Sequence, residues 1–453
     1  MDEQSSQSEN PPLTREDLVS FIRAGETPPQ EWVVGTEHEK IGVFEEGYAA
    51  VPYEGPHGIG AFLNRMAELD DWSPVYEGEN VIALLKDGAS ITLEPGGQLE
   101  LSGAPLRTIH QTCEEFHNHL RLVKEISQSF GIMWLGLGIR PLHGVDDVPR
   151  MPKTRYGIMR AYLPTRAKLG VEMMHLTATV QANFDFSDEV DMRRKMQLAT
   201  GISPILSAVY ANSSIAESKP TGYASRRLRI WRDTDPDRCG LLPFVFDPDF
   251  GYGDYVDWAL DVPMFFIVRG GQYFAMRGKY FRQFMQVGHE GHSATVGDFE
   301  LHLTTLFPEV RLKRVIEVRG CDAVPCMMTC ALPAFWKGLL YDEEAGGAAW
   351  ELVKDWQFEE RVEFLAAAAR DGLSARTARG SAKDLAEKLI SLSTEGLRRI
   401  GHAGHGEPDE TSFLAPLQEQ IASGKSPGEL ILEKWEGEWD HSLPRLMDYA
   451  RYC

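Results

Sequence analysis

The sequence predicts an α+β fold for a chain of 453 residues. Two observations support this prediction. Segments in which polar and apolar residues alternate occur between residues 31 and 319, and segments with helical spacing lie between them. Beyond Tyr341 the helical spacing dominates. Strands and helices that are partly segregated along one chain are typical of the α+β class.

The first part of the chain, as far as Gly131, contains five predicted elements. A helix begins at a threonine cap within residues 14–25, with an aspartate at the capping-box position and a glycine at its end. Residues 31–44 alternate and predict a strand. Residues 90–102 predict two extended segments on either side of a Pro-Gly-Gly turn. Residues 108–130 carry an apolar stripe that predicts a helix, which ends at Gly131.

The rest of the chain begins with a strand predicted over residues 133–139. Residues 171–186 show the clearest alternation of the chain and predict a longer strand. A helix is expected over residues 190–212, and residues 311–319 predict a further strand. After Tyr341 the spacing predicts mainly helices, and one of them is capped by a serine and an aspartate three residues later.

These elements predict three parts of the chain. Residues 1–12 are polar and acidic and predict a disordered tail. Residues 13–340 form the core that carries the candidate site, and residues 341–453 form a mainly helical part packed on that core.

Composition excludes several classes of protein. The net charge of −21 argues against broad nucleic-acid binding, although bound cations would still permit an anionic substrate. The absence of a long apolar run predicts no membrane span. The polar start of the chain has neither the pattern of a signal peptide nor that of a transit peptide, which predicts a cytoplasmic location. Six cysteines in a chain of this length do not indicate a disulfide scaffold or a regular zinc motif.

Acidic residues recur on one face of the predicted strands. Glu37 and Glu39 are two residues apart, so their carboxylates share a face about 7 Å apart. In the segment at 90–102, the even-numbered positions carry the polar residues Glu94, Gln98 and Glu100, and the odd-numbered positions carry the apolar residues. Like charges so placed repel one another unless a cation lies between them. A solvated strand face is the alternative, and it is weaker when both segments are counted together.

Two later strands add further polar groups. Gln181 and Asn183 lie on one face of their strand, and that pattern fits a solvent face as well as a site. Glu317 and Arg319 share a face of the predicted strand at residues 311–319. They form either a plain ion pair or a place where a cation and a phosphate oxygen are held.

Together these residues predict a magnesium site, because Mg²⁺ prefers oxygen ligands and commonly bridges substrate phosphates. No Walker A motif is present, so ATP would be held by cations and arginines. Two classes of protein could use the same residues. One is a phosphotransferase, which would consume ATP without any amine acceptor. The other is a non-catalytic acidic scaffold, which would bind magnesium but release no ADP.

Long motifs of the chain closely resemble those of glutamate–cysteine ligases of the plant and proteobacterial type. The motifs occupy residues 32–40, 91–105, 151–156, 179–186, 231–238, 302–314 and 331–342. The resemblance implies a fold like that of glutamine synthetase, in which a curved, mainly antiparallel sheet cradles the site and helices surround it. It also implies that residues 13–340 are the catalytic ligase core. In that family ATP phosphorylates the γ-carboxylate of glutamate, and the amino group of cysteine attacks the acyl phosphate, as the first step of glutathione synthesis.

The resemblance also implies roles for individual residues. The expected metal ligands are Glu37, Glu39, Glu94, Glu100, Gln181 and Glu317. The expected contacts to glutamate or phosphate are Arg227, Arg319, Lys153, Arg155, Tyr156 and Asn183, with Arg319 and Arg227 as the catalytic pair. Cys113 and Cys330 resemble a pair that forms a redox-sensitive disulfide, although an apolar helix face also explains Cys113.

One segment departs from the family pattern. Residues 321–328 replace a small-residue turn followed by a tryptophan and basic residues, and this segment is expected near the site. A related ligase that couples glutamate to a different amine is therefore the alternative function. The expected partners are glutamate, cysteine and ATP, in a monomer or homodimer. His402 and His405 are interpreted as loop residues rather than metal ligands.

Overall fold

The computed structural model describes residues 12–452, so the predicted tail lies outside the described residues except for Pro12. Its centre is a nine-stranded sheet with the order β14-β15-β7-β1-β5-β4-β3-β2, and β6 pairs with the end of β1. All of these pairings are antiparallel. The strands are β1 (Val34–Phe44), β2 (Ser73–Glu77), β3 (Asn80–Lys86), β4 (Ala89–Leu93), β5 (Leu99–Ser102), β6 (Ile132–Leu135), β7 (Thr179–Phe184), β14 (Val310–Leu312) and β15 (Ile316–Asp322).

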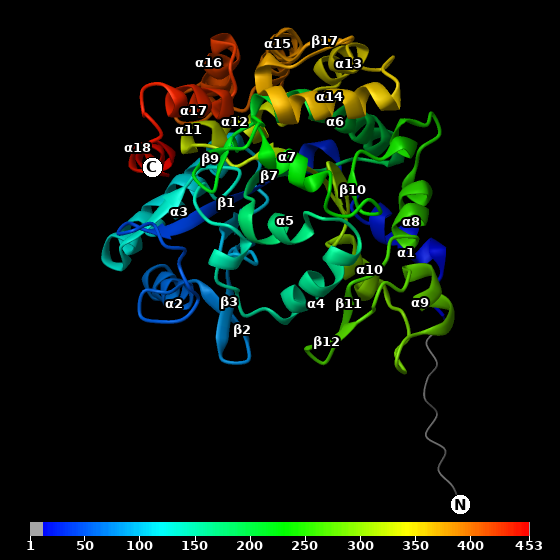
Figure 1. Cartoon of the computed structure of the whole chain (residues 1–453). Coiled ribbons are helices and arrows are strands. Elements are labelled where there is room, and N and C mark those ends of the chain that lie inside the picture. The colour runs from blue at the N-terminus through cyan, green and yellow to red at the C-terminus, as the bar shows by residue number, and fades with distance from the viewer. Residues whose placement is uncertain (1–11, 453) are drawn as a thin grey trace, which may run out of the picture.

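Helices surround this sheet (Figure 1). They are α1 (Arg15–Arg23), α2 (Ile59–Leu69), α3 (Ile109–Phe130), α4 (Thr154–Tyr162), α5 (Gly170–Leu176), α6 (Glu189–Val209), α7 (Arg226–Trp231), α8 (Tyr252–Leu260), α9 (Phe281–Val287), α10 (Val296–Leu303), α11 (Cys326–Thr329), α12 (Ala331–Leu340), α13 (Glu343–Glu351), α14 (Phe358–Asp371), α15 (Ala382–Ile400), α16 (Ala415–Ser423), α17 (Pro427–Glu436) and α18 (Leu443–Ala450). The α+β prediction is confirmed.

Four short ribbons lie outside the main sheet. They are β8 (Ile215–Ala216) with β9 (Lys219–Pro220), β10 (Cys239–Gly240) with β13 (Phe307–Pro308), β11 (Phe266–Arg269) with β12 (Gln272–Ala275), and β16 (Arg376–Thr377) with β17 (Gly380–Ser381).

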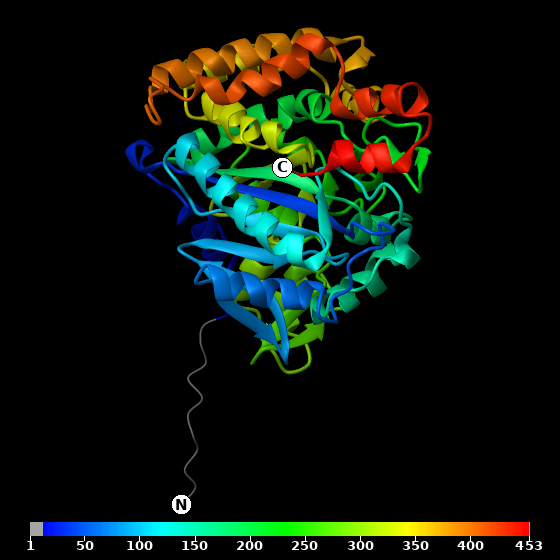
Figure 2. The same ribbon diagram turned by 90° about the vertical axis from the view of Figure 1, so that its left-hand side faces the viewer.

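Two layers of helices lie over one face of the sheet. Helices α6 and α12 pack directly on β15 and β7, and α14 and α15 pack on α6 and α12. Figure 2 shows the helices beyond Tyr341 gathered at the top of the molecule, above the sheet. The apolar side chains that join these layers are buried, as Phe184, Ile202, Phe335 and Leu389 illustrate. The opposite face, freed from this packing, can carry polar groups.

The predicted helix ends are present. Thr14 and Asp17 form a reciprocal capping box at the start of α1. Helix α3 ends at Gly131, whose φ of 65° is a left-handed conformation that glycine adopts without strain. Ser381 caps α15, which ends at Gly401. These local signals are short-range, so the sequence alone reveals them.

Three predicted strands are wrong in part. The segment at 133–139 is a strand only as far as Leu135. The segment at 171–186 is helical as far as Leu176, and only Thr179–Phe184 forms a strand. Glutamate, methionine and leucine favour a helix in its first half, where the alternation of polar and apolar residues was misleading. The segment at 311–319 is a hairpin rather than one strand, because β14 turns back through Lys313 into β15. No glycine or proline marks that turn.

Candidate functional site

The acidic residues of β1 face those of the neighbouring strands across the middle of the sheet. Glu39 lies directly opposite Glu100 of β5, and Glu37 lies opposite Gln181 of β7. Opposed residues of antiparallel strands point to the same face. The strand register therefore converts separate local patterns into one patch of carboxylate and amide groups.

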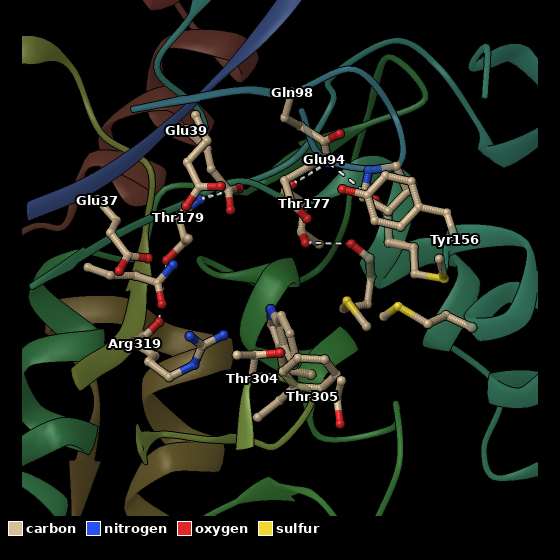
Figure 3. Close-up of a pocket in the computed structure, with 18 of the residues that line it drawn as sticks. Glu37, Glu39, Glu94, Gln98, Tyr156, Thr177, Thr179, Thr304, Thr305 and Arg319 are labelled. Atoms are coloured by element: carbon tan, nitrogen blue, oxygen red, sulfur yellow. Dashed lines mark hydrogen bonds between the residues drawn. The ribbon is translucent and has the colours of Figure 1, made fainter. Parts of the chain in front are cut away.

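This patch forms one wall of a cavity with an empty volume of about 1020 Å³, including the part open to solvent. Figure 3 shows Glu37, Glu39 and Glu94 on one side and Arg319, Thr304 and Thr305 on the other. The predicted residues that line the cavity are Glu37, Glu39, Glu94, Glu100, Gln181, Arg155, Tyr156, Arg227 and Arg319. Lys153, Asn183 and Glu317 lie outside this lining, as do Cys113 and Cys330.

Burial and mutual repulsion perturb the carboxyl groups of the patch. Burial, followed by the charges of Glu317 and Glu100, raises the pKa of Glu37 to about 7. Burial and the charges of Glu94 and Glu100 hold the pKa of Glu39 well above its ordinary value. Hydrogen bonds act in the opposite direction, since Asn183 Nδ2 donates to Glu37 Oε1 at 2.8 Å. The patch thus resists full ionisation unless a cation balances it.

Gln181 adds a neutral oxygen to the same wall. Its side chain is 4% exposed, and its Oε1 has no hydrogen-bond partner among residues 12–452. A buried acceptor without a donor is unfavourable, and a cation would satisfy it. The set of carboxylate and amide oxygens fits a magnesium ion, which prefers such ligands.

Glu317 has a different environment from the other carboxylates. It is fully buried and is surrounded by Arg311, Lys313 and Arg319, with the closest Arg319 contact at 3.2 Å. Although burial raises the pKa of Glu317, the three cations together hold it well below its ordinary value. The ion-pair interpretation is therefore what the structure shows, and Glu317 orients two arginines that line the cavity.

The structure separates Arg227 from its arginine neighbours. Arg226 pairs with Glu172 at 3.1 Å and Arg229 pairs with Asp233 at 3.0 Å, and neither lines the cavity. Arg227 is 4% exposed and lines the cavity, and its guanidinium donates to the backbone oxygens of Arg319 and Gly320. Of the three arginines of α7, Arg227 alone can reach a ligand in this cavity.

The basic segment at the start of α4 lies at the edge of the site. Lys153 is buried and donates to the backbone oxygen of Leu93 at 2.9 Å, while Tyr156 donates to the same oxygen. Burial and the neighbouring Arg155 lower the pKa of Lys153 to about 8. Arg155 and Tyr156 line the main cavity, and Lys153 lines an adjoining one. Of this segment, Arg155 and Tyr156 are the residues that meet the main cavity.

Several residues of the cavity had no predicted role. They are Pro95, Thr177, Thr179, Thr304, Thr305, Arg311, Trp231, Phe266 and Phe307, with three methionines from α4 and α5. Gln98, which the hairpin pattern placed among the polar groups, also lines the cavity. The motif at 302–314 contains the two threonines and Arg311, so that motif was the available signal. That motif also contains Phe307, and the other motifs contain Pro95, Thr179 and Trp231. Thr177, Phe266 and the three methionines reach the site through packing that no local pattern encodes.

The unusual segment 321–328 lies behind the site rather than in it. None of its residues lines the cavity, and its first two residues continue β15. Asp322 is buried, accepts hydrogen bonds from Ser213 and Ser225, and lies 3.7 Å from Arg227. The segment therefore lies near the site, as expected, and acts on the cavity through groups such as Arg227 without lining it.

Cys113 and Cys330 are joined by a disulfide, with Cα atoms 5.7 Å apart and a sequence separation of 217. The bond links α3 to the start of α12. The redox response of this bond stays a prediction, which the Cys113→Ser variant tests.

The fold and the site together define a class of protein. An antiparallel sheet that presents carboxylates to arginines across one cavity is suited to hold a divalent cation with an anionic, phosphate-bearing substrate. Within that class, the chain belongs to the glutamate-cysteine ligase family 2, whose profile matches residues 33–448.

Similar proteins agree with this family. The chain is 46% identical over 445 residues to the chloroplastic glutamate–cysteine ligase A of Oryza sativa subsp. indica, covering 97% of this chain and 88% of that protein. It is also 46% identical to the chloroplastic glutamate–cysteine ligase of Nicotiana tabacum, covering 97% and 83% of the two chains. A glutamate–cysteine ligase from Francisella tularensis, solved in complex with AMP, shares the fold with a TM-score of 0.58 at 14% identity, covering 92% and 87% of the two chains. The resemblance and the predicted fold are confirmed.

Within residues 12–452, no helix combines the length and the apolar character needed to cross a lipid bilayer.

Proposed function

We propose that this protein uses ATP to join the γ-carboxylate of glutamate to the amino group of cysteine, as the first step of glutathione synthesis. The reaction proceeds through γ-glutamyl phosphate, because a free carboxylate is a poor acyl donor. The observation that carries the proposal is the cavity of a ligase-family chain in which a carboxylate wall faces Arg227 and Arg319. Such an arrangement supplies placement and charge neutralisation, which dominate phosphoryl transfer.

The carboxylate wall would hold magnesium. Glu37, Glu39, Glu94, Glu100 and Gln181 line one side of the cavity and offer oxygen ligands. Bound Mg²⁺ would neutralise charge on the phosphate oxygens during transfer. Glu317 is proposed as a further ligand, for which its carboxylate would exchange part of its ion-pair network for the cation.

The arginines would hold the anionic substrates. Arg227 is proposed to bind a carboxylate of glutamate, because guanidinium pairs with carboxylate through two parallel hydrogen bonds. Arg319 is proposed to contact the transferred phosphoryl group, and Arg155 and Tyr156 lie on the same cavity for substrate or phosphate. Lys153 and Asn183 would act from just behind the residues that line the cavity. Asn183 would do so by orienting Glu37, to which it donates a hydrogen bond.

The acceptor amine is the finer part of the proposal. Residues 321–328 raised the alternative of a different amine, yet that segment does not line the cavity. Its position supports cysteine, the acceptor named for the curated relatives.

Product analysis tests the reaction and the acceptor together. Purified protein is incubated with ATP, Mg²⁺ and glutamate, with and without cysteine, and both ADP and the product mass are measured. The expected result is ADP release that depends on cysteine, together with the mass of γ-glutamylcysteine. Equal release with other amino acids would favour the alternative ligase, and release without any amine would favour a phosphotransferase.

Location and assembly complete the proposal. A cytoplasmic location is proposed, whereas the names of the curated relatives place those proteins in the chloroplast. Cell fractionation followed by immunoblotting decides between the two compartments. The chain is proposed to act as a monomer or homodimer, which light scattering measures, and to bind no nucleic acid.

A further inference from the structure

A cluster of cysteine and histidine side chains lies outside the carboxylate cavity, where α3 meets the residue that precedes α12. Cys113 and His117 are four residues apart on α3 and share one face of that helix. Cys330 adjoins them through its bond to Cys113. One potential ligand atom from each of the three residues lies within 4.8 Å of the others. In Figure 2 the cyan helix α3 runs along the side that faces the viewer.

The spacing of these atoms matches a tetrahedral zinc site. Zinc–sulfur and zinc–nitrogen bonds of about 2.3 and 2.1 Å place tetrahedral S and N ligands about 3.6 Å apart. The distance between His117 Nδ1 and Cys113 Sγ is 3.5 Å. Two thiolates on one zinc ion lie about 3.8 Å apart. Once the disulfide is reduced, rotation of the two side chains is enough to bring the sulfurs to that separation.

We propose that the reduced protein binds one Zn²⁺ ion through the thiolates of Cys113 and Cys330 and the imidazole of His117. Three protein ligands leave the fourth position to water or to another side chain. The site is separate from the carboxylate cavity, because none of its residues lines that cavity.

The chemistry balances in two steps. A dithiol reductant transfers two electrons and two protons to the disulfide, which yields two cysteine thiols and the oxidised, cyclic form of the reductant. Zinc then replaces the two thiol protons, which pass to the buffer, and forms two Zn–S bonds. His117 Nδ1 lies 2.7 Å from the backbone oxygen of Cys113, so zinc binding exchanges that hydrogen bond for a bond to the metal.

The surroundings favour a soft-ligand site over a general cation site. The surface cavity beside the cluster is lined by Glu114, Arg121 and Lys124, whose net positive charge opposes a free cation but tolerates a zinc ion neutralised by two thiolates. His110 also lines this cavity, is 4% exposed, and has no hydrogen-bond partner for its Nε2 among the described residues. A buried imidazole nitrogen without a partner is a candidate for the fourth position.

Zinc bound in this way would hold α3 and α12 together, as the disulfide does, while withdrawing both thiols from oxidation. The site would therefore make the state of this crosslink depend on zinc as well as on the redox conditions.

Cobalt substitution provides a direct test, because thiolate-to-Co²⁺ charge-transfer absorption reports sulfur ligands that a carboxylate site lacks. Full-length protein is reduced with a dithiol, freed of reductant without oxygen, and titrated with Co²⁺ in excess Mg²⁺. Absorption should saturate at a single equivalent and disappear when Zn²⁺ is added. Cys113→Ser and Cys330→Ser should abolish it, and His117→Ala should weaken binding by about tenfold or more.

Cys239→Ser is the matched control, because Cys239 is a free cysteine outside the cluster, and it should behave as the wild type. Circular dichroism checks that each variant is folded. The proposal is overturned if folded, reduced wild type gives no charge-transfer absorption, or if the absorption persists in Cys330→Ser. Unchanged affinity in His117→Ala would equally overturn the three-ligand site.

Discussion

Replacing Glu37 by glutamine should make the metal-free protein more stable while it removes activity. Burial and neighbouring carboxylates raise the pKa of Glu37 from 4.5 to about 7, a difference that corresponds to roughly 3 kcal/mol of cost for its charged form. Because this carboxylate is only half-buried, solvent screening makes that figure an upper limit. Glutamine retains an oxygen for the hydrogen bond from Asn183 and carries no charge.

The sign of the effect depends on pH. A carboxyl group with a raised pKa in the folded state contributes stability below about 4.5, and that contribution is lost as the pH rises through about 7. The variant and the wild type should therefore be equally stable at low pH. The difference in stability between the two proteins should grow as the pH rises from about 4.5 to about 7, and it should be largest above pH 7.

Thermal unfolding in chelator at pH 5 and pH 8 measures this difference. At pH 8 the variant should melt higher by on the order of 3 °C, and saturating Mg²⁺ should reduce or reverse the gap because it stabilises the charged wild type. Glu46→Gln, at an exposed position of the same segment, should change neither stability nor ADP release. A lower melting temperature for Glu37→Gln in chelator at pH 8 would refute the reasoning.

Three further changes should separate the roles of neighbouring groups. Glu317→Gln should lower the free energy of unfolding by about 3–5 kcal/mol, because it leaves the guanidinium of Arg311 and its cationic neighbours without their buried partner; urea unfolding near that of wild type would contradict the ion-pair interpretation. Arg227→Lys should raise KM for glutamate by about tenfold or more through loss of a two-pronged carboxylate contact, while Arg226→Lys leaves it unchanged in steady-state assays. An equal response of both variants would remove Arg227 from the glutamate site. Cys113→Ser should abolish the difference in activity between oxidised and reduced protein, and a redox profile like that of the wild type would exclude the disulfide as its cause.

The stability effects of the two glutamates should thus have opposite signs, although both were predicted as metal ligands. Glu37 lies among carboxylates, whereas Glu317 lies among cations. The alternation of each strand could place either side chain on a polar face, but it could not say which charges the fold would bring opposite to it. That information is in the strand register and in the β14–β15 turn.

The sequence by itself determined the local features of this protein. Helix caps such as Thr14 and Gly131, and the shared face of Glu37 and Glu39, follow from interactions between residues a few positions apart. The family resemblance added the fold and the identity of the acidic residues. Tertiary structure decided that Glu39 meets Glu100, that Arg227 rather than Arg226 reaches the cavity, and that residues 321–328 lie behind it. These outcomes depend on contacts between distant segments, whose geometry is set by packing of the whole sheet and its helices and not by any local pattern.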